Sequence, residues 1–358
     1  MSRIFVAGWG AVSPAGWNAA ALCGALEGGT PLPLQPVDRP GWEKPLRARL
    51  VPNPAVRPGF LAHPRLRRTS LITHYAAAAA LEAVAGRGAT RDRKCRLGIV
   101  ICLQSGCVNY SCRFFDEVLK DPSTASPLLF PETVYAAPAS HVAALLENVT
   151  LACSLVGDPA SFLQGAALAV QWLEENRVDA CLVIGAEETN WILADALWHL
   201  DRPAIITGGA GALCLGRDPK LSAGVELAAI TDPHTYSGGC SRRQAARAMR
   251  LQLGKSDPGE LLCDGIAGGS RADAPELAAW RDWTGPRVSP KRILGEGMMA
   301  AAAWQCVAAC HAVAGCRFTA ANVSLVGSNQ QALGARFVRA DSSISHLSAG
   351  GSTGNIQP

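Results

Sequence analysis

The chain of 358 residues has little charge, few aromatic side chains and no long apolar run. Only 17% of its residues are charged and 6% are aromatic, and 33 basic residues stand against 29 acidic ones. This even balance gives no sign of a nucleic-acid-binding or membrane-binding surface. No run approaches the roughly 18 to 20 apolar residues that span a bilayer. The first eleven residues have the pattern of a strand and not of a signal peptide, so we expect a cytoplasmic protein.

The 13 cysteines include no CxxC pair, which argues against a structural metal site or a disulfide framework. Cys306, Cys310 and Cys316 come closest to a cluster, and on an alanine-rich segment we expect them to act as small buried hydrophobic residues. The glycines of residues 208–211 lack the strand, turn and helix context of a phosphate-binding loop. We therefore expect neither a metal nor a cofactor.

Predicted strands and helices alternate along the chain, which is typical of an α/β protein. Residues 97–103 are apolar throughout, and residues 179–185 are apolar after Asp179, as in strands that are buried on both faces. Residues 29–58 contain eight prolines, and we expect them to form a long surface loop without a pattern of core residues. We expect two α/β halves, residues 1–218 and 219–340, followed by a mobile tail at 341–358 that is rich in Ser and Gly.

Four segments, in this order, carry a family resemblance: RIFVAGWGAVSPAGWN at 3–18, SPLLFPETVYAAPASHVA at 126–143, DACLVIGAEE at 179–188 and GGAGALCL at 208–215. Their sequences and spacing resemble those of β-ketoacyl-acyl carrier protein synthases. The resemblance implies a thiolase-like fold, with two similar βαβαβαββ-type halves in a five-layer α-β-α-β-α arrangement. It also implies a dimer that forms through the strand before the nucleophile.

The three catalytic positions of that family are degenerate here. The family's cysteine nucleophile lies about twenty residues before the Asp of the third motif, and this distance leads to Pro159, which has no nucleophile. Asp264 and Glu296 stand where the family has its two histidines, while the family's lysine is retained as Lys291. A carboxylate at either histidine position would repel a malonyl group or a developing oxyanion. The family's glycine-rich C-terminal loop is replaced by residues 327–332.

Loss of all three groups on a retained scaffold points to a non-catalytic ketosynthase-like subunit, similar to a chain length factor of type II polyketide or aryl polyene synthesis. The resemblance implies a heterodimer with an active ketosynthase, access to an acyl carrier protein through the complex, and a role in shaping the partner's acyl tunnel in fatty acid-like synthesis. We expect the interface to include eleven residues: Thr150, Leu151, Ala152, Cys153, Ser154, Leu155, Val156, Phe130, Pro131, Val134 and Tyr135.

Two alternatives stay open at the level of sequence. One is an enzyme with altered chemistry, an acyl hydrolase or a decarboxylase, that uses Cys153, His141, Asp264 or Glu296. In this interpretation Asp264 and Glu296 lie near each other and pair with Lys291, or one of them is protonated. The other alternative is a scaffold that stabilises an active partner without lining its tunnel. A basic cluster at Arg65, Arg67 and Arg68 is either a contact for an acidic carrier protein or a solvated helix start.

Overall fold

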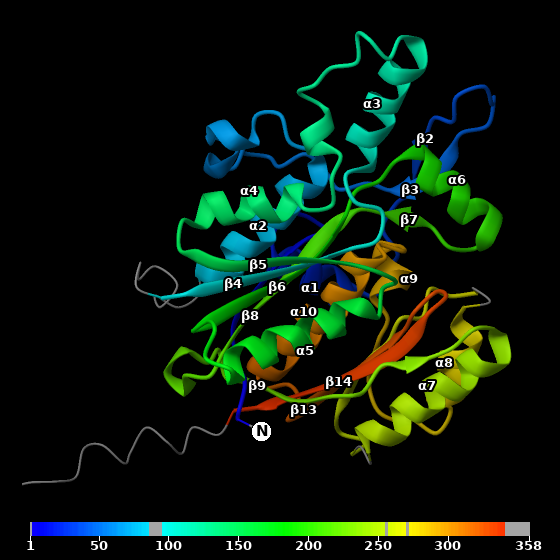
Figure 1. Cartoon of the computed structure of the whole chain (residues 1–358). Coiled ribbons are helices and arrows are strands. Elements are labelled where there is room, and N and C mark those ends of the chain that lie inside the picture. The colour runs from blue at the N-terminus through cyan, green and yellow to red at the C-terminus, as the bar shows by residue number, and fades with distance from the viewer. Residues whose placement is uncertain (1, 86–94, 255–256, 270–271, 341–358) are drawn as a thin grey trace, which may run out of the picture.

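Two layers of strands enclose a middle layer of helices, and further helices cover the outer faces (Figure 1). The computed structural model describes residues 2–85, 95–254, 257–269 and 272–340. From one face to the other, the layers are α2 and α4, the first set of strands, α1 with α5 and α10, the second set of strands, and α7 with α8. The described residues therefore have the predicted five-layer α-β-α-β-α arrangement. The predicted tail lies outside these residues.

The helices of the layers are α1 (Ala19–Gly28), α2 (Leu71–Ala85), α4 (Ala137–Leu146), α5 (Ser161–Glu174), α7 (Gly239–Leu253), α8 (Asp273–Ala279) and α10 (Met299–Ala314). The first set of strands consists of β1 (Phe5–Val12), β4 (Leu97–Leu103), β5 (Val149–Val156), β6 (Ala180–Glu187) and β8 (Gly209–Gly216). The second consists of β9 (Val225–Ile230), β10 (His234–Thr235), β11 (Leu261–Cys263), β12 (Arg287–Val288), β13 (Ala320–Val326) and β14 (Gln331–Arg339).

The two sets of strands repeat one pairing pattern. In the first set, β5, β4 and β6 pair in parallel, and β6, β8 and β1 then pair antiparallel. In the second set, β12, β11 and β13 pair in parallel, and β13, β14 and β9 then pair antiparallel. A short pairing of β1 with β9 joins the sets, so β5 and β12 occupy the two outer edges. The repeated pattern shows that the halves are structurally similar.

Glycines on β1 allow the outer helix α2 to pack directly on the strand. A Cβ atom at Gly8 would lie 2.2 Å from the carbonyl oxygen of Ala83, and one at Gly10 would lie 2.2 Å from that of Ala79. Glu82 of the same helix accepts hydrogen bonds from the backbone N–H groups of Ala11 and Ala19, both at 2.9 Å. The sequence around β1 therefore fixes the position of α2 through close contact and through hydrogen bonds to the backbone.

Some structured segments were not predicted. Residues 29–58 contain β2 (Gln35–Val37) and β3 (Leu46–Arg49), which form a small sheet with β7 (Ile206–Thr207). Its core is Leu46, Ala48 and Ile206, so the expectation of a segment without a core was wrong. The helices α3 (Val108–Lys120) and α6 (Trp191–Leu200) were also missed. Cys316 is exposed, although Cys306 and Cys310 are buried as expected.

Replacing Gly10 by Ala should lower the free energy of unfolding by about 2 kcal/mol or more, since the new methyl group must push α2 away from β1. A matched control is Gly24→Ala, because Gly24 is an exposed residue of α1 with open space around its Cβ position. The control should raise stability by about 0.5 to 1 kcal/mol. Urea unfolding of both variants tests this, and equal effects would contradict the close packing.

Candidate functional site

The junction between β5 and α5 holds Pro159, the residue that the sequence resemblance aligned with a nucleophile. It consists of Gly157, Asp158, Pro159 and Ala160, and its last three residues are buried. The first turn of α5 forms through hydrogen bonds from the N–H of Ser161 to Asp158 O at 2.8 Å and from the N–H of Phe162 to Pro159 O at 3.2 Å. Pro159 therefore lies inside this turn, and its side chain carries no group that can attack an acyl thioester.

The carboxylate of Asp158 connects this junction to the turn between β13 and β14. Asp158 is 2% exposed. Its Oδ2 accepts hydrogen bonds from the backbone N–H of Gln330 at 3.0 Å and of Gln331 at 3.4 Å. Burial raises the pKa of Asp158, while these N–H groups favour the ionised form. Tyr236 donates a hydrogen bond from its hydroxyl to Gly327 O in the same turn. These contacts join the junction to the turn, and the Asp158 carboxylate lies directly against Gly327.

Ser161 provides a hydroxyl at the start of α5, but no base accompanies it. The hydroxyl oxygen accepts a hydrogen bond from Gln331 Nε2 at 2.9 Å, and the same amide group donates to Gln164 Oε1 at 2.9 Å. A Cβ atom at Gly157 would lie 2.3 Å from Ser161 Oγ, so a side chain at residue 157 would displace the serine. Among the described residues, the hydroxyl of Ser161 is bonded to the amide of Gln331, and no hydrogen bond joins it to a carboxylate or an imidazole.

Asp264 is completely buried at the end of β11 and forms an internal ion pair. Its carboxylate accepts hydrogen bonds from Arg287 Nη1 at 3.1 Å and from Ser289 Oγ at 2.6 Å. Burial raises the pKa of Asp264, and these donors counteract that effect. The expectation that Asp264 pairs with Lys291 was wrong, because β12 runs parallel to β11 and places Arg287 nearer.

Lys291 pairs with Glu296 instead. The Nζ atom of Lys291 lies 2.7 Å from Glu296 Oε2, and both side chains are mostly buried. Burial alone would lower the pKa of Lys291, but the carboxylate of Glu296 raises it above its usual value. Glu276 lies near this pair and accepts a hydrogen bond from the N–H of Gly265 at 3.1 Å. Burial, followed by the charge of Asp264, raises the pKa of Glu276. The two degenerate histidine positions are thus part of a closed network of charges.

The structure does not assemble the four residues proposed for an altered enzyme. Cys153 lies inside β5, opposite Val100 of β4, and packs against the central core. His141 belongs to α4, and its Nε2 lies 3.0 Å from the carboxylate of Glu132. Among the described residues, no hydrogen bond or ion pair joins any two of Cys153, His141, Asp264 and Glu296. They do not form a common catalytic site.

The predicted interface residues lie on β5 and in the loop before α4. The outer edge of β5 has no strand beside it in the described parts of the chain. Val156 at its end is 55% exposed. Beside the predicted Phe130, Val134 and Tyr135, the structure adds residues of α3 and the following loop that the sequence did not indicate. We call the seven exposed residues the apolar surface: Phe115, Leu119, Leu128, Phe130, Val134, Tyr135 and Val156. Figure 1 shows α3 and this loop projecting beyond the layers.

Two buried carboxylates hold the start of α3 in place. Glu187 accepts hydrogen bonds from the N–H groups of Gln104 at 2.5 Å and Ser105 at 3.1 Å, just after β4. Glu188 accepts a hydrogen bond from the N–H of Asn109 at 2.7 Å, in the first turn of α3. Burial raises the pKa of Glu187 to about 7. The end of β6 therefore positions the segment that carries much of the apolar surface.

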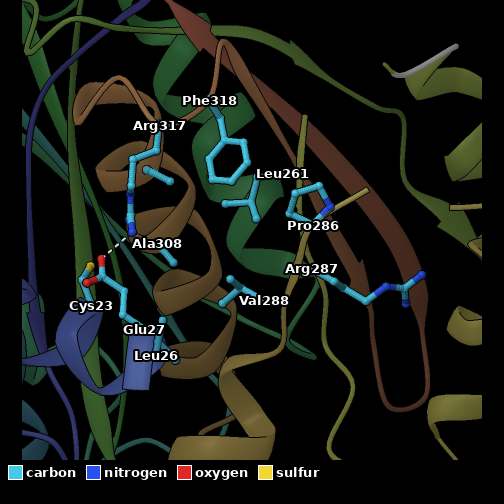
Figure 2. Close-up of a pocket in the computed structure, with 11 residues that line it drawn as sticks. Cys23, Leu26, Glu27, Leu261, Pro286, Arg287, Val288, Ala308, Arg317 and Phe318 are labelled. Atoms are coloured by element: carbon cyan, nitrogen blue, oxygen red, sulfur yellow. Dashed lines mark ion pairs between the residues drawn. The ribbon is translucent and has the colours of Figure 1, made fainter. Parts of the chain in front are cut away.

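A pocket of about 480 Å³ lies elsewhere, between α1, α10 and the strands β11 and β12 (Figure 2). Leu261, Val288 and Phe318 line it, and an ion pair of 2.6 Å between Arg317 and Glu27 crosses one side. None of the predicted site residues lines this pocket. Across the described ranges, no group of three or more His, Cys, Asp or Glu residues is arranged to hold a metal ion. The helices of these ranges are too short or too polar to cross a membrane.

Comparisons with known proteins agree with the fold. No protein-family model matches the chain, and no curated protein matches it. Among solved structures, the ishigamide ketosynthase/chain length factor superposes with a TM-score of 0.80 at 19% identity, over 95% of this chain and 100% of that one. A type II polyketide synthase acyl carrier protein in complex with its ketosynthase, bound to the hexaketide, superposes with a TM-score of 0.77 at 13% identity, over 95% of this chain and 99% of that one. A β-ketoacyl synthase from Burkholderia phymatum STM815 superposes with a TM-score of 0.77 at 17% identity, over 95% of this chain and 100% of that one.

The chain therefore has the thiolase-like fold of ketosynthases, as the sequence resemblance implied. Within that class, its fold resembles a ketosynthase/chain length factor structure over nearly its whole length.

The raised pKa of Glu187 predicts that stability falls as pH rises. The pKa is about 7 in the folded chain against an ordinary value of 4.5. Between these values the folded state keeps a proton that the unfolded state releases, so stability present below pH 4.5 is lost by pH 7. From pH 5 to 8, unfolding free energy should fall by about 2 to 3 kcal/mol more in the native chain than in Glu187→Gln. Urea unfolding measures this, and parallel pH profiles would contradict it.

Proposed function

We propose that this protein is a non-catalytic ketosynthase-like subunit, a chain length factor that pairs with an active β-ketoacyl-acyl carrier protein synthase in the cytoplasm. Polyketide, aryl polyene or other fatty acid-like synthesis is the pathway class that we infer for the complex. In this proposal the chain consists of two halves, residues 1–218 and residues 219–340. The observation that carries it is the β5–α5 junction, where Pro159 is buried and the carboxylate of Asp158 is bonded to the turn between β13 and β14.

The free edge of β5 and the apolar surface support a protein partner. Large apolar side chains that gather on an exposed surface commonly mark interfaces. Phe130 also packs on Phe114 of α3, with 5.6 Å between the ring centroids, so the loop and the helix form one surface. An unpaired strand edge offers backbone N–H and C=O groups to a second strand. A second ketosynthase-fold chain presents a matching edge, which favours it as the partner.

The proposed complex also meets an acyl carrier protein. Arg65, Arg67 and Arg68 are all exposed around a short helix (Pro64–Leu66) next to the start of α2. Clustered positive charge would attract an acidic carrier protein and increase the rate of association. The solved neighbours include a carrier protein bound to its ketosynthase, which supports this partner class.

The alternative enzyme receives no support from the geometry. A catalytic nucleophile needs a base within hydrogen-bond reach. His141 is paired with Glu132, Asp264 with Arg287, and Glu296 with Lys291. These three side chains each pair with a different residue and none pairs with Cys153, so no second function is proposed.

Co-expression with the ketosynthase encoded beside this chain tests the proposal. Size-exclusion chromatography should give a one-to-one complex, and an elongation assay with malonyl-loaded carrier protein should show turnover. The activity should persist in Cys153→Ala and disappear when the partner's nucleophilic cysteine is replaced. A homodimer with turnover of its own that depends on Cys153 or Asp264 would refute the proposed function.

Val156→Asp should weaken the complex by about 100-fold or more. The variant buries an unpaired carboxylate at the edge of the interface, at a cost of about 3 kcal/mol. Leu251→Asp is the matched control, because Leu251 is 70% exposed on α7, in another layer of the molecule. Dissociation constants from calorimetry would be compared. Equal affinities for the two variants would show that the partner binds elsewhere.

Product length distinguishes a tunnel-shaping subunit from a scaffold. Phe130 and Tyr135 carry the bulky side chains of the loop that precedes α4, and both are partly exposed at the proposed interface. Phe130→Ala or Tyr135→Ala should shift the product toward longer chains by removing bulk from the tunnel end. Mass spectrometry of carrier-bound products gives the lengths. An unchanged distribution in an intact complex would favour the scaffold role.

A further inference from the structure

The Asp158 carboxylate occupies a binding site made of backbone N–H groups. Besides the hydrogen bonds from Gln330 and Gln331, the backbone N–H groups of Asn329 and Ala160 favour its ionised form. The site thus combines one turn of the second set of strands with the first turn of α5. Converging N–H groups and a helix N-terminus are the typical components of an anion site in proteins.

No cation shares this site. Asp158 forms no ion pair with Lys or Arg within the described residues, unlike Asp264 and Glu296. Its Oδ1 atom is buried without a hydrogen-bond partner. A carboxylate in such a position is stabilised by the backbone dipoles alone, because water is excluded. The site recognises the charge and the planar shape of a carboxylate, and it makes no contact that is specific for the rest of a ligand.

Glycine shapes the site around the carboxylate. A Cβ atom at Gly327 would lie 1.8 Å from Asp158 Oδ2, so any other residue at 327 would collide with it. The Tyr236 hydroxyl holds the carbonyl of Gly327 from the other side. The turn between β13 and β14 is therefore fitted to a carboxylate at this point.

We propose that Asp158 is an internal ligand of a backbone anion site, formed by residues 327–331 and the start of α5, and that this site accepts small monocarboxylates once the side chain of Asp158 is removed. In the native chain the site is filled, so an acid or an acyl oxygen that reaches the junction finds its N–H donors occupied. The inference stands apart from the pairing with a ketosynthase and does not depend on it.

Chemical rescue of Asp158→Gly tests this site. Acetate should raise the thermal midpoint of the full-length variant, by on the order of 3 °C at ten times its dissociation constant, since a ligand of the folded state stabilises it. The native chain should show no such rise relative to sodium chloride at equal ionic strength. Acetamide has the same shape without the charge and should have no effect on the variant. An equal response of the native and variant chains to acetate would overturn the proposal.

Two further variants keep the result interpretable. Ser161→Ala removes a neighbouring hydrogen bond but leaves Asp158 in place, so acetate should not stabilise it. Asp158→Asn keeps the side-chain volume, so it should also gain nothing from acetate. If Asp158→Gly is recovered only in aggregates, refolding from urea gives the readout, and acetate should increase the yield of soluble protein over acetamide. Equal yields with the two additives would overturn the proposal.

Discussion

The fold depends on one helix, α10, which lies between the two sets of strands and is almost entirely buried. Trp304 anchors it, because its indole N–H lies 3.1 Å from Val12 O and 2.9 Å from Ala210 O at the ends of β1 and β8. A Cβ atom at Gly211 would lie 2.7 Å from Ala303 Cβ. The helix therefore needs small residues on the strands it touches. Both halves of the molecule are positioned by packing against it.

Three carboxylates at or beside the positions that the resemblance aligned with catalytic residues make contacts within the protein. Asp158 links the first half to the turn of the second, Asp264 links β11 to β12 through Arg287, and Glu296 neutralises Lys291. Each of these polar groups is satisfied mainly by other groups of the protein. A reactive site needs donors and acceptors that remain available to a substrate. In this chain the carboxylates of Asp158, Asp264 and Glu296 are already bonded to donors of the protein itself.

The sequence predicted the layers well because apolar strands and alanine-rich helices carry strong patterns. The run at β4 was predicted with its exact bounds. The missed helix α3 has no buried residue, so its sequence shows no apolar stripe that faces a core. The strand β3 was missed because it lies in the proline-rich segment 29–58. At the site, the sequence predicted that Pro159 stands at the start of a helix after a strand, and the structure places it there. The partners of Asp158 and Asp264 could not be predicted, because they come from residues more than 20 positions away that only the fold brings close.

The residues of β5 do not protect its exposed edge from pairing with other strands. None of its eight residues is charged and none is proline, which are the usual protections of an exposed strand edge. A chain made in excess of whatever covers this edge would present a template to other copies of itself. Self-association of the chain through an uncovered β5 edge should therefore increase with its own concentration.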